Sequence, residues 1–168
     1  MARADCLVMR IERTSAAADI DAAAQIWAEA TAARDGEDEV AELADSRPII
    51  QRVLDRSRGS LLLLARTDDG DPVAFAAVEP AAGHQQATAE ICYFGVSPAS
   101  WGQGVGERLL RGLVAELAAA EFTSAELSVY VDNVRATRLY ERLGWRAFGD
   151  PTPHPRTGKP EQRYRLGL

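Results

Sequence analysis

The chain has 168 residues, of which 46% are hydrophobic and 26% are charged, and its formal net charge is -6. This composition is that of an ordinary globular domain with enough apolar residues to bury a core. It argues against a general nucleic-acid surface, which would be basic. We therefore expect a single domain over residues 1–168 and no nucleic-acid partner.

Cysteine and histidine are too sparse for a metal centre or a disulfide framework. Cys6 and Cys92 stand alone, outside any CxxC pair, and so do His84 and His154. We predict no metal site and interpret each cysteine as a small core residue. No apolar run is long enough to cross a bilayer, and residues 1–19 lack an apolar signal core. These features predict a cytoplasmic protein with no membrane partner.

The first half of the chain predicts a strand, two helices and a hairpin. Residues 6–11 form a short apolar run that is typical of a strand. Asp19 or Asp21 is expected to cap a helix that runs to about residue 33. The other elements expected here are a loop over 34–39, a helix over 40–56 with a bend at Pro48, strands over 61–66 and 72–79 joined by a turn at 68–70, and a loop over 80–86.

The second half predicts a buried strand, a glycine-rich loop and a helix in direct succession. Residues 88–96 (TAEICYFGV) are mostly apolar and rich in aromatic and β-branched types, which is typical of a strand buried on both faces. Alternate glycines then precede a helical pattern over 107–120. The remaining expected elements are a strand over 126–131, a helix over 133–143 capped by Asp132 and ended by Gly144, and strands over 145–148 and 162–166 joined by a proline-rich loop over 150–160.

The loop after the buried strand has the features of an anion-binding site. Gly102, Gly104 and Gly106 remove side chains that would keep a phosphate from the backbone, and the first amides of the next helix lack intrahelical partners. The same glycines also suit a tight turn. A Rossmann site requires its loop on the first strand, and a P-loop requires a Lys-Ser/Thr pair after the glycines, so neither fits this sequence.

Three segments carry a family resemblance. They are the strand over 89–96 with the Ser-Pro that follows it, the loop and helix start over 101–110 (WGQGVGERLL), and residues 133–145 (NVRATRLYERLGW). In this order and at these separations they make the chain similar to the GNAT superfamily of N-acyltransferases, closely over 88–148 and by element order elsewhere. The resemblance implies an α/β (α+β) fold with a mixed central sheet of about six to seven strands flanked by about four helices. It also implies transfer of an acetyl group from acetyl-CoA to an amine acceptor.

The resemblance places the acetyl-CoA site around the glycine loop. The family pattern there is Arg or Gln, two residues, Gly, one residue, and Gly or Ala. Gly104 and Gly106 match it, whereas Trp101 stands at the leading position and Gln103 is out of register. The backbone amides of the loop are expected to bind the diphosphate, and the strand end is expected to pair with the pantetheine arm. The residues expected to bind acetyl-CoA are Phe94, Gly95, Val96, Trp101, Gly102, Gln103, Gly104, Val105, Gly106 and Asn133.

Two side chains are the expected catalytic residues. The resemblance implies that Tyr140, two helical turns after Asn133, approaches the thioester sulfur with its hydroxyl. An amine must lose a proton to attack, and Glu90 is the expected base because it lies on the central strand among apolar neighbours. The amide of Gly95 or Val96 is expected to hold the developing oxyanion. The alternatives are that Asn133 only caps its helix, that Tyr140 is a core aromatic with a satisfied hydroxyl, and that Glu90 faces solvent.

The resemblance places the acceptor near residues 27–47, 80–88 and 150–160. Acidic residues over 35–42 suit a cationic amine, although such a run is also typical of a solvated helix start. A small-molecule amine is the expected acceptor, and a protein N-terminus or lysine is the alternative. A catalytically silent CoA-binding module and a nucleotide-phosphate binder are the alternatives from other classes. A homodimer is left open.

Overall fold

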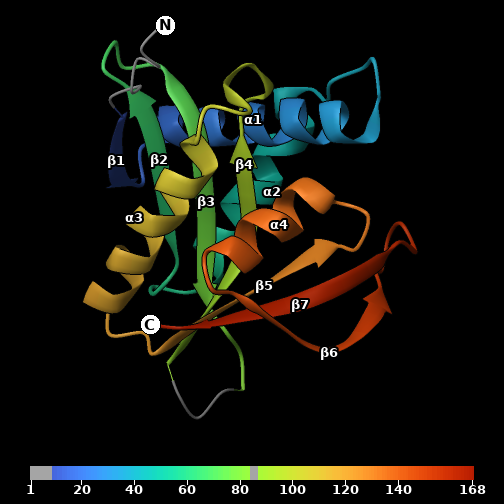
Figure 1. Ribbon diagram of the computed structural model, residues 1–168. Helices are drawn as coiled ribbons and strands as arrows, with labels where there is room; N and C mark the ends of the chain where they lie inside the picture. The colour runs from blue at the N-terminus through green and yellow to red at the C-terminus, as the bar shows by residue number, and fades with distance from the viewer. Residues whose placement is uncertain (1–8, 84–86) are drawn as a thin grey trace, which may run out of the picture.

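The chain folds around one seven-stranded sheet with helices on both faces (Figure 1). The structure is a computed structural model that describes residues 9–83 and 87–168. The strand order is β1-β2-β3-β4-β5-β7-β6, and every neighbouring pair is antiparallel except β4–β5. The elements are β1 (Met9–Thr14), α1 (Ala17–Asp35), α2 (Leu43–Arg56), β2 (Leu61–Thr67), β3 (Pro72–Pro80), β4 (Thr88–Val96), the 3-10 helix η1 (Pro98–Ser100), α3 (Val105–Ala119), β5 (Ser124–Tyr130), α4 (Val134–Arg142), β6 (Arg146–Pro153) and β7 (Pro160–Gly167). The predicted fold class and the predicted order of strands and helices are confirmed.

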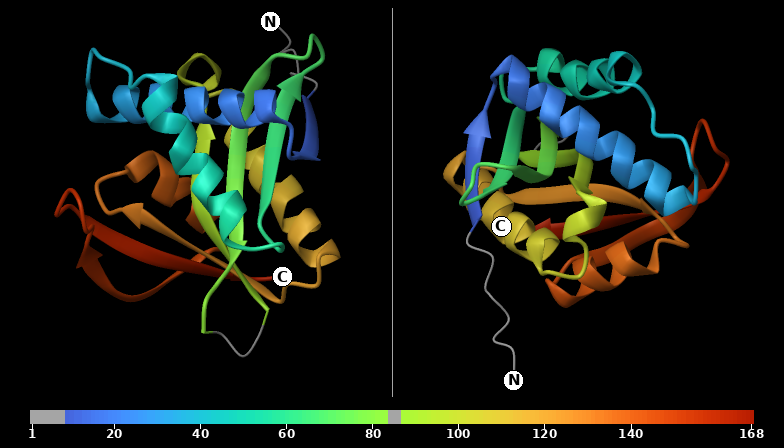
Figure 2. Two further views of the ribbon diagram at one scale, coloured as in Figure 1. Left: turned by 180° about the vertical axis from the view of Figure 1, so that it is seen from behind. Right: turned by 90° about the horizontal axis from the view of Figure 1, so that it is seen from above.

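Two apolar clusters divide the core between the faces of the sheet (Figure 2). One cluster lies beneath α1 and α2 and includes Ile50 and Phe75. The other lies beneath α3 and α4 and includes Leu109, Leu113 and Tyr140. Side chains of the central strands alternate between the two clusters, so the sheet buries both of its faces.

The start of α1 differs from the prediction. Its N-cap is Ala16, not Asp19 or Asp21, and no side chain of a described residue caps it. Asp19 lies in the first turn, where it accepts a hydrogen bond from Thr14 Oγ1 at 2.6 Å and pairs with Arg66. The carboxylate that suggested a cap therefore ties α1 to β1 and β2 instead.

Other boundaries also differ from the predictions. Asp132 is not the cap of α4, because Asn133 occupies the N-cap position and its side chain accepts from Ala136 N–H. Helix α1 continues to Asp35 and ends at Gly36 in the left-handed conformation. Strands β6 and β7 are longer than expected, so the proline-rich loop shrinks to 154–159. The predicted first strand is shifted to Met9–Thr14, and Cys6 lies outside the described residues.

Strand β4 separates from β5 half-way along its length. It pairs with β3 throughout but with β5 only from Thr88 to Ile91. The β3–β4 register shifts so that Cys92 is an extra residue, which is a β-bulge that bends a strand and increases its twist. Residues 92–94 are consequently only partly buried, which corrects the prediction of a strand buried on both faces. Beyond the bulge, β4 has an open backbone edge toward β5.

Gly95 lies on this diverging segment because a larger residue would collide with the core. An ideal Cβ there would lie 2.6 Å from Cε1 of Phe75, which is fully buried. We predict that Gly95→Ala lowers the free energy of unfolding by about 1–3 kcal/mol through overpacking. Gly167→Ala is the control, since its Cβ would meet nothing within 4 Å. Urea unfolding measures both, and a Gly95→Ala protein as stable as the wild type would contradict the contact.

Candidate active site

The glycine loop carries the chain from β4 into α3. Gly102 and Gly104 have φ angles of 78° and 76°, a left-handed conformation that other residues disfavour. Gly104 is the N-cap of α3, and Arg108 N–H makes the first bond back, to Gly104 O at 3.1 Å. The amides of residues 105–107 precede that bond and have no intrahelical acceptor. This row of N–H donors at the positive end of a helix fits a diphosphate.

Gly106 allows α3, α4 and β4 to meet closely. An ideal Cβ at this position would lie 3.3 Å from Leu139 Cδ2 and 3.5 Å from Val96 Cγ2. The third glycine of the motif is therefore required by packing as well as by access to the backbone. It places the start of α3 directly against α4 and the end of β4.

Trp101 joins the glycine loop to two other elements. Its indole N–H donates to Val96 O at 2.8 Å, and the guanidinium of Arg135 lies 4.3 Å from its ring centroid. The carbonyl of Val96, expected to pair with pantetheine, thus already accepts one hydrogen bond. Gln103 donates to Ala99 O at 3.0 Å, so its amide nitrogen is engaged within the loop.

Asn133 adopts the capping role that the sequence left open. Its Oδ1 accepts from Ala136 N–H at 3.2 Å. Its amide nitrogen makes no hydrogen bond to a residue within 9–83 or 87–168, so the cap leaves a donor at the start of α4. The contact with the cofactor arm stays a prediction.

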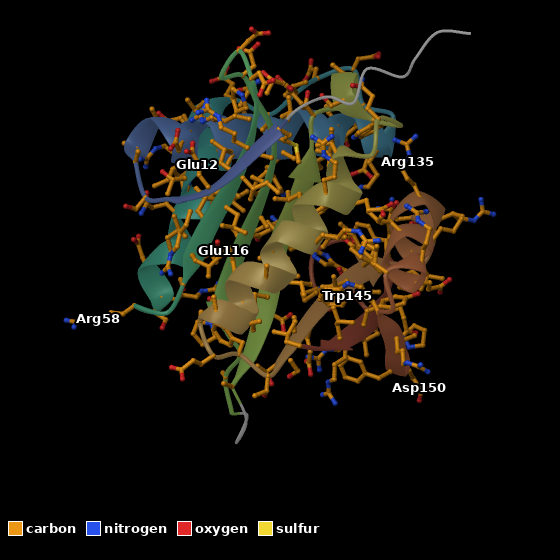
Figure 3. All side chains as sticks on the ribbon, turned by 60° about the vertical axis from the view of Figure 1, so that its left-hand side comes forward. Glu12, Arg58, Glu116, Arg135, Trp145 and Asp150 are labelled. Carbon is orange, nitrogen blue, oxygen red and sulfur yellow. The ribbon has the colours of Figure 1, made fainter. Side chains whose placement is uncertain are left out.

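Tyr140 is a core aromatic packed among other aromatic side chains. It is 6% exposed and packs against Phe94, Trp145 and Tyr164, with ring centroids 6.5, 6.0 and 6.1 Å away; Figure 3 shows Trp145 between α3 and α4. Burial raises the pKa of the Tyr140 hydroxyl well above its ordinary value, so it stays protonated at neutral pH. The hydroxyl has no hydrogen-bond partner in the described part of the chain. It is therefore available as a donor beside the open half of β4.

Glu90 is the middle member of a row of three glutamates. The strand register places it between Glu79 of β3 and Glu126 of β5. Its neighbours along the strand, Ala89 and Ile91, pack beneath α3, so Glu90 faces the α1 and α2 side of the sheet. The apolar neighbours expected from the sequence are those along the strand. Across the strands the neighbours are acidic.

Arginines of β7 offset the charge of this row. Glu126 is fully buried and pairs with Arg163 and Arg165. Arg163 also lies 3.9 Å from Glu90 Oε2. Both guanidinium groups stack on Phe148, at 4.9 and 4.5 Å from the ring centroid. The sequence analysis missed this cluster. The two arginines are two residues apart on a strand and therefore lie on one face of β7, which was a signal for the cluster.

Cys92 does not have the properties of a nucleophile. Burial, with a smaller contribution from Glu79, raises the pKa of its thiol to about 12. The thiol therefore stays protonated at neutral pH, and the thiolate is the reactive form. This favours direct attack of the amine over an acyl-cysteine intermediate.

The β6–β7 loop is fastened to the end of α1 around Tyr130. Arg34 and Lys159 lie over the Tyr130 ring, at 5.0 and 5.5 Å from its centroid, and both cations pair with Asp35. Thr157 Oγ1 donates to the Tyr130 hydroxyl at 3.2 Å. We call these five residues the Tyr130 bridge. It joins two of the regions expected to surround the acceptor (Figure 2, right).

Residues 9–83 and 87–168 contain no group of three or more His, Cys, Asp or Glu side chains placed to hold a metal ion. Within the same residues, each helix is too short or too polar to cross a lipid bilayer.

Comparison with known proteins decides the family. A family model described as the acetyltransferase (GNAT) family matches residues 20–145. The chain belongs to the GNAT acetyltransferase family. Acetyl-CoA is the acyl donor of this family, and the glycine loop, the open edge of β4 and the start of α3 fit its diphosphate and its amide-bearing arm.

Relatives of this GNAT protein include one curated enzyme and many solved structures. Mycothiol acetyltransferase of Renibacterium salmoninarum is 29% identical over 103 residues, which are 61% of this chain but only 30% of that protein. The ribosomal-protein-S18-alanine N-acetyltransferase of Escherichia coli has a TM-score of 0.72 at 22% identity, covering 96% of this chain and 94% of the other. An acetyltransferase structure from Salmonella typhimurium with its cofactor acetyl-CoA has a TM-score of 0.69 at 19% identity, covering 95% and 94%. At these identities the solved structures share the fold.

Proposed function

We propose that this GNAT protein transfers the acetyl group of acetyl-CoA directly to the amine of a small molecule. The observation that carries the proposal is the position of Tyr140, whose ring lies 6.5 Å from that of Phe94 on the open half of β4. Its hydroxyl is protonated and has no hydrogen-bond partner in the described structure. In this proposal residues 1–168 act as one domain in the cytoplasm.

The chain's own groups divide the work of binding and transfer. Bound acetyl-CoA supplies an activated thioester. The amides of residues 105–107 hold the diphosphate, and the β4 backbone beyond Ile91 offers donors and acceptors to the amide-bearing arm. The N–H of Val96 donates to the reacting carbonyl oxygen. Ser97 N–H bonds to Val73 O across β3, so the alternate residue Gly95 also faces β3, whereas Val96 faces the open edge. Tyr140 donates to the departing sulfur, which needs a proton because it leaves as a thiolate.

Glu90 is the proposed base. It lies at the last paired residues of β4 and β5, on the face of the sheet that α1 and α2 cover. The carboxylate takes the proton of the incoming amine directly or through water. Arg163, 3.9 Å from Glu90, limits the repulsion within the glutamate row.

Two observations favour a small-molecule acceptor over a protein. The Tyr130 bridge joins α1 to the β6–β7 loop, and we propose that it limits access of a polypeptide from that side. The curated relative is named for mycothiol rather than for a protein. The glutamate row suits an acceptor that arrives as a cation.

An acceptor panel tests the proposal. We expect acetyl-CoA-dependent thiol release with small primary amines and none with peptides that offer a free N-terminus or a lysine. Turnover with peptides and not with small amines would indicate a protein acetyltransferase instead. Acetyl-CoA binding without turnover across the panel would indicate a silent module, and equal affinity for ATP or NAD would indicate a nucleotide binder.

Tyr140→Phe should separate catalysis from stability. We expect kcat to fall by about 100-fold or more because the proton donor is lost. The melting temperature should not fall, since the removed hydroxyl has no partner in the described structure. Tyr164→Phe is the control: its hydroxyl donates to Glu141 at 3.1 Å, so it should lose about 1 kcal/mol of stability and keep its kcat. A Tyr140→Phe protein with the wild-type kcat would remove the tyrosine from the mechanism.

Glu90→Gln should produce a defect that depends on pH. We expect kcat/KM at pH 7 to fall by about 100-fold. The defect should shrink as the pH approaches the pKa of the amine, about 10, because more acceptor is then already neutral. Glu79→Gln, the adjacent member of the row, should keep most of its activity. A wild-type pH profile for Glu90→Gln would show that another group or water alone accepts the proton.

A further inference from the structure

Position 101 departs from the family pattern and brings a different cation to the glycine loop. Trp101 stands where the family has Arg or Gln, and the guanidinium of Arg135 stacks on its ring. We propose that Arg135, held on this ring, binds the diphosphate of acetyl-CoA in place of the usual Arg or Gln. The inference rests on the proposed acetyl-CoA site and adds to it a residue from a different helix.

The indole ring of Trp101 is a fixed platform. Its backbone N–H bonds to Pro98 O at 3.2 Å, at the end of η1, and its indole N–H bonds to Val96 O at 2.8 Å. The side chain is thus held at both ends, between the strand end and the glycine loop. Because Trp101 directly precedes Gly102, a cation over its ring lies at the start of the glycine loop.

Arg135 reaches this platform from the first turn of α4. The cap at Asn133, two residues earlier, fixes the start of that helix, and Figure 3 shows Arg135 at the end of α4 that lies near the loop before α3. A guanidinium that stacks face to face keeps its N–H donors at its edge, where they can make two parallel bonds to phosphate oxygens. The amides at the start of α3 would bind the diphosphate from one side and Arg135 from another.

Two other arginines near the start of α3 pair with one glutamate. Arg111 and Arg142 both pair with Glu107, at 3.0 and 3.1 Å. Arg135 pairs with no carboxylate of the described residues, and its guanidinium lies over the Trp101 ring. A purely structural stack would affect stability slightly and leave CoA binding unchanged.

Calorimetric titration with CoA tests the proposal without relying on turnover. We expect Arg135→Gln to raise the Kd of CoA about 10-fold, the usual effect of losing one hydrogen-bonded charge. Arg58→Gln is the control, since Arg58 is exposed and lies on the opposite side of the molecule from Arg135 in Figure 3. It should change the Kd by less than about twofold because distant exposed charges are screened. Both variants should melt like the wild type. If wild-type protein fails to bind CoA, the proposed function fails; if it binds and Arg135→Gln binds equally well, only this inference fails.

Two further binding measurements test which phosphate Arg135 contacts and whether Trp101 positions Arg135. Dephospho-CoA keeps the diphosphate, so Arg135→Gln should weaken its binding by the same factor; a loss confined to CoA would assign Arg135 to the 3′-phosphate and overturn the proposal. Trp101→Phe keeps a ring and should preserve the contribution of Arg135. In a Trp101→Ala background, Arg135→Gln should add less than about twofold, because coupled residues are not additive. A full additional loss there would show that Arg135 acts without Trp101.

Discussion

The separation of β4 from β5 after Ile91 is the constraint on which the rest of the site depends. The bulge at Cys92 bends β4 away, and the small residue at Gly95 lets the bent segment lie against Phe75. A paired β4 would have no free backbone groups for a ligand. The glycine loop begins where this strand ends, and Tyr140 lies beside its open half. The same local irregularity thus sets the position of the anion site, the open edge and the phenol.

Ion pairs, as well as backbone geometry, stabilise the separation of β4 from β5. At the last residues where β4 and β5 pair, Glu126 is fully buried and bound by two arginines of β7. A buried carboxylate that lost these partners would be strongly unfavourable, so the network fixes β5 against β7 at the point where β4 departs. Glu90 lies beside this network. The candidate base is therefore positioned by the groups that hold the strands together.

The sequence predicted the local structural features around the candidate site and missed those that depend on register. The glycine loop, and the spacing of Asn133 and Tyr140 along one helix, are contained within short segments, so their patterns were sufficient. The predicted caps of α1 (Asp19 or Asp21) and α4 (Asp132) were wrong for different reasons. Asp19 is engaged by Thr14 and Arg66, and α1 begins without a side-chain cap, whereas the neighbouring Asn133 caps α4. The acidic neighbours of Glu90 come from strands that are distant in sequence. The stack of Arg135 on Trp101 likewise joins helix α4 to the glycine loop, whose relative position no sequence pattern reveals.

That stack links donor binding to the helix that carries the proposed acid. Helix α4 has nine residues, and Tyr140 is its buried residue within the described structure. Its position relies on a few contacts: the Asn133 cap, the packing of Leu139 on Gly106 and the aromatic group around Tyr140. If Arg135 binds the diphosphate, then the ligand contacts both α3 and α4 and draws them together. Binding of the donor would then restrict the helix from which Tyr140 projects, so that the hydroxyl is held in place when the thioester is present.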